Sequence, residues 1–563
     1  MTGNPSNDDG FNRSAGRQLL LIAVGSVIGI VLLMLGLSWA SGLAGGPRVS
    51  KGIDAATGTV TLALADEPPQ LDSTRSTDTI SSMVLGHVTE GLIRNGEGGE
   101  LAPGVAERWE ITDAGATFWL RADARWSDGK PVTAHDFVFA WRKAVDPKTA
   151  SEYATILFAI KNAEAINKGR APISSLGVQA LGDNVLRVEL VRPVPYFAKL
   201  MVFSTFRPIR EDFFNATAGR YGADADMLLY NGPFTITRWV HGAQLRMEKN
   251  PYYWDKNRVK VKVLDFAYFS SDPNALINLY KDGKIAVAGL NQENLNEALV
   301  KRWPINRFQR GSVFYMEFNH RKDRPTTNLH LRRAIQLVID PDEVVYRVIK
   351  LPGNLPGRSL FPVWLDGNQG KFREEYPATQ VLPNAVEARR QLALAKKELG
   401  LETLPPLTLL SDDGALGDKM TEYFQETLRR ELGLTIRIDK QIFKQRLAKM
   451  SAGDFDLVLG GWNPDYPDPL TFADLFASWN SNNRGRYNNP RLDQLVAVAQ
   501  TSTDVQTRMD TFGEIQRILI EDPPMVPIYE PGVVYVVDPR LQGVVRRVAG
   551  FDPDYTNVSI VGK

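Results

Sequence analysis

The stretch DLVLGGWNPDYPDPL, from Asp456 to Leu470, contains two unlike halves. The first half is an almost unbroken apolar run, which is typical of a strand that is covered on both faces of a sheet. The second half begins at Trp462 and brings carboxylates, a tyrosine and three prolines. A central strand explains the first half only, so the neighbouring sequence has to explain the second.

The sequence before this stretch alternates strand and helix patterns. LTLL at Leu407–Leu410 predicts a short strand, and LTIRID from Leu434 predicts another by its alternation of apolar and polar residues. A helix that ends at Gly433 is predicted between them, and a second one from Ile442 to Met450. The apolar positions of the first helix recur every fourth residue: Leu416, Met420, Phe424, Leu428 and Leu432. The order strand, helix, strand, helix, strand predicts a parallel α/β sheet with right-handed crossovers.

A parallel sheet would explain the position of the polar half of the stretch. Ligands of open α/β sheets bind just beyond the carboxyl ends of the strands, where Trp462–Asp468 would lie. A carboxylate in a partly dry cleft is costly unless a cation accompanies it, so Asp465 would suit a ligand amine. The alternative is a proline-rich turn whose aspartates cap backbone amides, and the residues alone leave both interpretations open.

Composition excludes several classes of function. The chain has 563 residues, and its 66 Lys and Arg nearly balance its 65 Asp and Glu, so no basic excess favours nucleic acid. It has no cysteine, which excludes disulfides, thiolate metal sites and a cysteine nucleophile. Its five histidines include no HExxH pattern, and no GxSxG or Walker motif is present. We expect no cofactor, no metal and no catalytic activity.

The N-terminal region predicts a membrane segment. Residues 19–40 are 22 positions without a charge, or roughly 33 Å of helix against an apolar bilayer core of about 30 Å. Secretory signals usually have a shorter apolar region, so an uncleaved anchor is favoured, although SWASGLA offers small residues for cleavage. Residues 1–18 are then a cytoplasmic tail and residues 41–58 a linker.

Several motifs resemble, in order, the bacterial extracellular solute-binding proteins of family 5. They include LAPGVAERWEITDAGATFWLRADARWSDGKPVTAHDF, NGPFTITRWVHGAQLRMEKNPYYW, FYMEFNH, GGWNPDYPDP and PMVPIYEPGVVYVV. The resemblance extends from about Thr59 to the end of the chain. Most of these motifs also have structural readings: Thr133 and Asp136 form a capping-box pattern, and Gly129 suits a turn position with positive φ.

The resemblance implies a two-lobed α/β fold of the periplasmic-binding-protein kind, type II, with an extra subdomain and a two-strand hinge. The implied segments are lobe I at residues 59–100, 202–307 and 523–563, the extra subdomain at 101–201, and lobe II at 311–522.

The resemblance also gives the opening stretch a role. In peptide-binding relatives, an aspartate three residues after the tryptophan binds the α-ammonium group of the peptide, and Trp462 and Asp465 match that spacing. We expect ligand contacts from Gly461, Trp462, Asn463, Asp465 and Tyr466. The oligopeptide-binding protein has an arginine three residues before the tryptophan, where this chain has Leu459, so the way a ligand carboxylate is held stays open. Arg484 and Arg486 are expected to be surface residues.

The expected function is capture rather than chemistry. A monomeric receptor outside the cytoplasm, anchored to the inner membrane or secreted, would close on a short peptide and deliver it to a permease driven by an ATPase. Two alternatives stay open: a non-peptide ligand such as a metal chelate, haem, opine or sugar, and a membrane-tethered sensor without a transport role.

Overall fold

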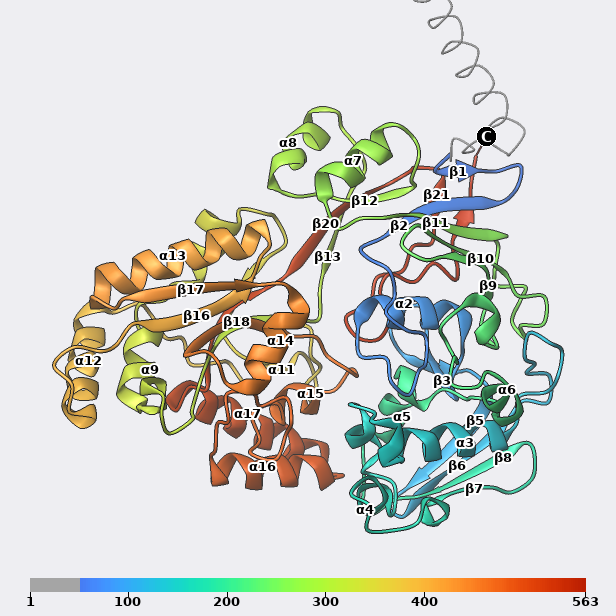
Figure 1. The fold of residues 1–563 in the computed structure, drawn as a ribbon, viewed down its shortest axis with the longest axis horizontal. Coiled ribbons are helices and arrows are strands. Elements are labelled where there is room, and N and C mark those ends of the chain that lie inside the picture. Colours follow the sequence, from blue (N-terminus) through green and yellow to red (C-terminus); the bar gives the residue numbers. More distant parts are fainter. Residues whose placement is uncertain (1–50, 563) are drawn as a thin grey trace, which may run out of the picture. The chain divides into compact units, whose positions relative to one another are not determined.

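The computed structural model describes residues 51–562, whose helices and strands are labelled in Figure 1. The predicted tail at 1–18, the predicted membrane segment at 19–40 and most of the predicted linker lie outside the described residues. Within residues 51–562, no helix combines the length and the apolar character that a membrane crossing requires.

The first lobe is built on a five-stranded sheet in the order β1-β2-β11-β10-β9. Its strands are β1 Ile53–Asp54, β2 Thr59–Leu64, β9 Phe234–Val240, β10 Gln244–Lys249 and β11 Val263–Phe269. β2 pairs in parallel with β11, which comes much later in the sequence, and the other pairs are antiparallel. Helix α2 (Thr79–Val88) shares the buried core of this sheet with Tyr555 and Val558, so the C-terminal segment belongs to this lobe.

An antiparallel sheet in the order β5-β6-β8-β7 forms the extra subdomain. Its strands are β5 Ala106–Thr112, β6 Gly115–Leu120, β7 Val178–Ala180 and β8 Val185–Glu189. Helix α3 (Ala134–Val145) packs near it and begins with the predicted capping box of Thr133 and Asp136. Gly129 has φ +85°, as its turn position predicts. A separate pair, β3 (Ile93–Asn95) with β4 (Leu101–Pro103), precedes this sheet.

The chain passes between the lobes twice. A small sheet contains β12 (Val287–Gly289), β20 (Gly532–Val537) and β13 (Ile305–Gln309), with β20 in the middle. Residues 310–312 lead from β13 into the second lobe, and Pro531 leads back into β20. The two crossing strands are those the family fold implies, and β12 adds a third strand beside them. Helices α7 (Pro273–Lys281) and α8 (Gln292–Val300) pack against this sheet.

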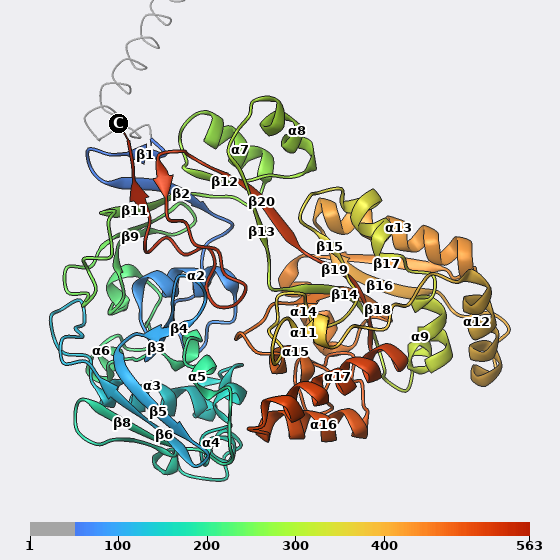
Figure 2. The same ribbon diagram turned by 180° about the vertical axis from the view of Figure 1, so that it is seen from behind.

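The second lobe is built on a six-stranded sheet in the order β15-β19-β14-β18-β16-β17, visible from behind in Figure 2. The strands are β14 Val313–Phe318, β15 Leu355–Pro356, β16 Leu407–Asp412, β17 Ile436–Gln441, β18 Leu457–Trp462 and β19 Met525–Glu530. β16 pairs in parallel with both β17 and β18, and α13 (Ala415–Leu432) and α14 (Phe443–Ala452) connect them. The predicted strand-helix-strand-helix-strand unit is therefore confirmed.

One sequence expectation for this lobe is wrong in detail. The return to the first lobe was predicted from residue 523, but β19 pairs with β14 inside the second-lobe sheet, so the return begins after Glu530. The run is apolar in either lobe, and sequence alone does not reveal its pairing partner. Leu416 is 39% exposed, because it lies in the first turn of α13, whereas Met420, Phe424 and Leu428 are buried. The other predicted segment boundaries stay predictions.

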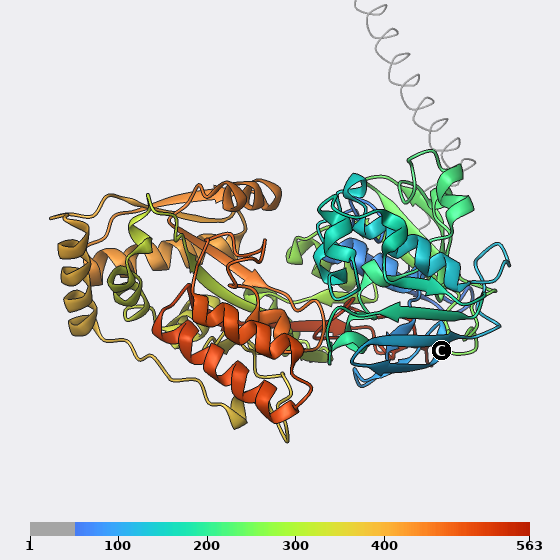
Figure 3. The same cartoon turned by 90° about the horizontal axis from the view of Figure 1, so that it is seen from below.

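The second lobe contains further helices besides α13 and α14. They include α9 Leu329–Gln336, α12 Ala385–Leu399, α15 Leu470–Ala473, α16 Pro490–Thr501 and α17 Val505–Glu521. Figure 3 shows the orange-red α16 and α17 side by side. The short helix α15 follows soon after the Trp462–Asp468 loop and contacts both α16 and α17, so it connects the loop to these two helices.

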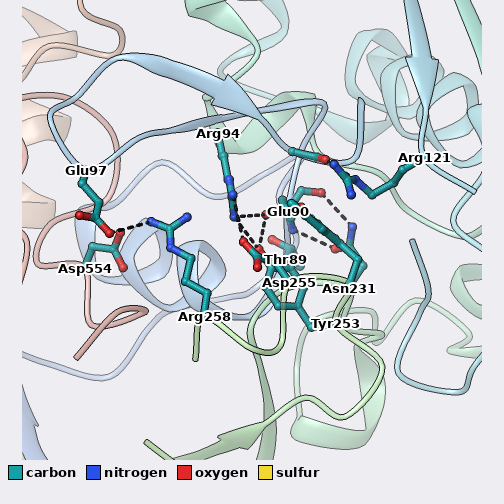
Figure 4. A network of polar contacts seen from close by, with 12 residues as sticks. Thr89, Glu90, Arg94, Glu97, Arg121, Asn231, Tyr253, Asp255, Arg258 and Asp554 are labelled. Carbon is teal, nitrogen blue, oxygen red and sulfur yellow. Dashed lines mark hydrogen bonds and ion pairs between the residues drawn. The ribbon is translucent and has the colours of Figure 1, made fainter. Parts of the chain in front are cut away.

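A polar network is buried in the first lobe around Glu90 (Figure 4). Its carboxylate accepts hydrogen bonds from the Tyr253 hydroxyl at 2.5 Å and the Trp254 indole at 2.6 Å, and Arg94 lies 3.8 Å away. Arg94 in turn pairs with Asp255 at 3.0 Å. The PYYW aromatic motif therefore supports the fold by holding this carboxylate.

Candidate functional site

The candidate site begins where β18 ends. Leu457, Val458 and Leu459 are buried between β14 and β16, which explains the apolar half of the opening stretch. β14 pairs with β18 along its whole length, but β16 pairs only as far as Leu410 with Val458. The two parallel strands therefore part before β18 ends, and the Trp462–Asp468 loop leaves from the carboxyl edge of the sheet, as predicted.

Gly461 and Trp462 shape the start of this loop. A Cβ atom on Gly461 would lie 2.9 Å from the Phe314 ring, so only glycine lets that ring contact the backbone here. The Trp462 indole is partly buried and donates to the Thr471 hydroxyl at 3.3 Å. Asn463 is exposed, and the Ser312 hydroxyl donates a short hydrogen bond to its amide oxygen. All three predicted residues thus lie together at the end of β18.

Asp465 is a mostly buried carboxylate with one side-chain donor. The Tyr153 hydroxyl, which comes from the extra subdomain, donates to it at 3.1 Å, and the Asp465 amide donates to Thr471 at 3.1 Å. None of the ion pairs among residues 51–562 includes Asp465. Burial raises the pKa of Asp465 to about 7, and the hydrogen bond from Tyr153 offsets this only in part. In the described part of the chain, this carboxylate thus has a hydroxyl donor but no paired cation.

Asp468, three residues further, has the opposite environment. It is 1% exposed and binds Arg508 through both oxygens, at 2.5 and 2.9 Å, and Lys199 of α5 (Phe197–Leu200) at 3.1 Å. Burial alone would raise the pKa of Asp468, but Arg508 and Lys199 outweigh it and lower that pKa below its usual value. Asp468 is thus a structural residue that ties the loop to α17 and to the first lobe.

Tyr466 was predicted to contact the ligand. Its ring is 6% exposed and stacks on Tyr196 of the extra subdomain, with centroids 5.6 Å apart and planes 10° from parallel. Direct ligand contact would require these rings to separate, so this role stays a prediction. The stacking instead makes Tyr466 part of the contact between the extra subdomain and the second lobe.

Three residues of the site were not predicted. Tyr153 reaches Asp465 from 312 positions earlier in the sequence, and no local pattern marks it. Thr471 accepts hydrogen bonds from both Trp462 and Asp465, and a hydroxyl just after the loop is a weak signal that could have suggested it. Asp474 has its pKa raised to about 8 by burial and by the nearby Asp465 and Asp468, because carboxylates that lie close together disfavour one another's charge.

The positive side of the site differs from the family pattern. The Leu459 side chain belongs to the buried core of the second lobe, so it does not face a ligand. Arg486 is exposed, as predicted, but Arg484 is partly buried and contacts Asn482 at 3.4 Å. Within residues 51–562, no cluster of three or more histidine, aspartate and glutamate side chains could hold a metal ion.

Comparisons with known proteins show which family the chain resembles. The family model described as bacterial extracellular solute-binding proteins, family 5 Middle, matches residues 100–484. The oligopeptide-binding protein OppA of Bacillus subtilis is 30% identical over 512 residues, which cover 87% of this chain and 91% of that protein.

Solved structures extend the likeness to the fold. The substrate-binding domain of an oligopeptide ABC transporter from Bacillus anthracis is 35% identical, with a TM-score of 0.81, and covers 90% of this chain and 99% of its own. OppA of Listeria monocytogenes, solved bound to peptide, has a TM-score of 0.81 at 30% identity and covers 90% of this chain and all of its own. The chain belongs to the bacterial extracellular solute-binding proteins of family 5.

Proposed function

We propose that this protein is the substrate-binding protein of an ABC importer and captures short peptides between its two lobes. The observation that carries the proposal is Asp465, a mostly buried carboxylate with a tyrosine hydroxyl but no cation among residues 51–562. A carboxylate in this environment gains most from a ligand ammonium group, and every peptide with a free N-terminus has one.

The loop offers the other parts of a peptide site. Gly461 has no side chain and is exposed, so it presents backbone at the end of β18, where an extended peptide can pair its own backbone groups. Trp462 supplies a flat, partly buried wall beside them. Recognition through backbone and amine favours a shared peptide framework over one sequence, which suits a receptor for many peptides.

Capture would involve closure of the lobes. The contacts of Tyr153 with Asp465, Tyr196 with Tyr466 and Lys199 with Asp468 join the extra subdomain to the second lobe. In the part of the chain that the structure describes, the lobes are connected only through residues 310–312 and Pro531, which suits a hinge. In the proposed cycle these contacts separate to admit the ligand and form again around it.

Delivery would take place at the membrane. The apolar residues 19–40 would hold the protein at the outer face of the cytoplasmic membrane, close to a permease and its ATPase. The receptor would work as a monomer and without turnover, because binding and release complete its task.

Native mass spectrometry of the purified full-length chain, followed by denaturing extraction, tests the proposal. We expect a set of short peptides to leave with the protein. If a single non-peptide compound leaves with the protein instead, the proposed ligand class is wrong, although the fold assignment still holds. A protein that carries nothing and binds no peptide from a random mixture would favour a tethered sensor without transport.

A further inference from the structure

The sheet of the second lobe opens into a fork between β16 and β18. The last paired residues are Leu410 and Val458, and β18 continues to Trp462 without β16 beside it. The connecting helices lie on opposite faces: α14 packs on Leu410 and Val458, whereas α13 packs on Leu409 and Leu457. In open α/β sheets, such a point forms a crevice outside the carboxyl ends of the strands, and ligands bind there.

Arg446 of α14 fills this fork. Its Nη1 donates to the Leu459 carbonyl oxygen at 2.7 Å, whereas the pairing of β18 with β16 ends at Val458. The side chain is only 12% exposed. The Phe443 ring lies 5.4 Å from its guanidinium carbon and covers one side of it.

The guanidinium of Arg446 lacks a full set of acceptors. Its Nε is buried and has no hydrogen-bond partner, and its nearest carboxylate, Asp412, is 3.9 Å from Nη1, beyond hydrogen-bond range. Burial lowers the pKa of Arg446, and Asp412 offsets this only in part. One hydrogen bond to a carbonyl oxygen does not offset the free-energy cost of desolvating a guanidinium. Arg446 is therefore suited to bind a further anionic partner.

We propose that Arg446 binds a carboxylate of the ligand, at the fork between β16 and β18. The inference rests on the proposed function and adds the group that recognises the acidic end of the ligand. The Leu459 side chain belongs to the buried core, so only its carbonyl oxygen is available at the fork. The positive charge at the fork therefore comes from Arg446 of α14 and not from a residue of β18. The carboxylate is either the C-terminus of a peptide or an acidic side chain.

Calorimetric titration of the full-length chain tests this inference. The probes are trialanine, trialanine amide, and the tetrapeptide amides Ala-Ala-Glu-Ala and Ala-Ala-Gln-Ala. If the C-terminus is the partner, amidation of trialanine weakens wild-type binding by about tenfold to a hundredfold, and Arg446→Gln removes that difference. If an acidic side chain is the partner, the Glu and Gln peptides differ instead, again only with Arg446 present.

The controls show whether an effect comes from the charge of Arg446, from the loss of any nearby positive charge, or from a loss of folding. Arg437→Gln removes an exposed arginine of the neighbouring β17 and should preserve the wild-type discrimination. Arg446→Lys should restore part of it, and thermal unfolding shows whether each variant is folded. Two results would overturn this inference alone. The wild-type protein could bind peptides with and without the carboxylate equally well, or Arg446→Gln could distinguish them as well as wild type does. Wild-type protein that binds none of them overturns the proposed function as well.

Discussion

The Glu90 network of the first lobe and the Trp462–Asp468 loop of the second lobe both bury carboxylates, but they treat them differently. Glu90 accepts from Tyr253 and Trp254 and lies close to Arg94, all within the first lobe. Asp465 accepts one hydrogen bond, from Tyr153 across the lobe contact, and has no cation among residues 51–562. A carboxylate with a full set of partners holds the fold together, and one without them is available to a ligand.

Asp468 shows that this difference does not come from the loop itself. It lies three residues from Asp465 and is more deeply buried, yet Arg508 and Lys199 lower its pKa while that of Asp465 rises to about 7. Within residues 51–562, two cations pair with Asp468 and none pairs with Asp465. Burial alone does not mark a ligand site, and the missing counter-charge is what distinguishes Asp465 from Asp468.

The largest expected effect is on stability, at the fully partnered carboxylate. Glu90→Gln presents an amide donor to Tyr253 or Trp254, which are themselves donors, so one buried group loses its acceptor. We expect a loss of about 2 to 4 kcal/mol in the free energy of unfolding, measured by urea denaturation. Peptide affinity at room temperature should stay the same. A loss below about 1 kcal/mol would show that the network is not structural.

At the unpartnered carboxylate, the effect should fall on binding instead. Asp465→Asn should weaken binding of peptides with a free amine by about 1.5 to 3 kcal/mol, because a charge-assisted hydrogen bond is lost. Its unfolding free energy should not fall. A change in affinity below about threefold, measured by titration calorimetry, would remove Asp465 from its proposed role.

The pH dependence should separate the two sites further. Asp465, with its pKa of about 7, is mostly protonated in the free folded protein at lower pH. Peptide affinity should therefore fall by about tenfold per pH unit below that value, and it should fall again above about pH 8, where the peptide amine loses its proton.

The same pKa has a consequence for stability. The folded pKa of Asp465 lies above its unfolded value, so the folded state binds more protons between those values and wild-type stability falls as pH rises through about 7. The Asp465→Asn variant has no carboxyl group to titrate here, so it does not lose stability in this way. Its free energy of unfolding should exceed that of wild type at about pH 8 and equal it near about pH 4. An affinity independent of pH from about 5 to 8 would contradict the assignment.

The smallest expected effect is at the lobe contact. Tyr153→Phe removes the one side-chain donor of Asp465 and should weaken peptide binding by about 0.5 to 1.5 kcal/mol, the net value of a single hydrogen bond. Tyr376→Phe, on the second-lobe surface, removes an exposed hydroxyl that also contacts an aspartate and serves as the control. An equal loss in both variants would mean that the Tyr153 contact has no special role in binding.

The parallel unit of the second lobe was predictable because its signals are local. Periodicity located β16, α13, β17, α14 and β18, and their order implied the parallel sheet and the place of the loop at its carboxyl edge. The pairing of β19 was not predictable in this way, because its partner β14 lies some two hundred positions earlier and apolar strands resemble one another. The predicted membrane segment falls outside the described residues.

The candidate site was predictable only in part for the same reason. Gly461, Trp462, Asn463 and Asp465 lie on one loop, so one motif located them together. Tyr153 and Arg446 reach the same region from other elements, and only the fold brings them there. Tyr466 carried the same local signal as its neighbours, yet its contact with Tyr196 depends on the other lobe.

The central claim is that Asp465 receives the amine of the ligand, and a double-mutant cycle tests it most directly. The affinities of wild type and Asp465→Asn are measured for trialanine and for N-acetyl-trialanine. We predict that acetylation weakens wild-type binding by about tenfold or more and leaves the binding of Asp465→Asn nearly unchanged, because the interaction is already lost. An equal effect of acetylation on both proteins would place the amine elsewhere and contradict the account.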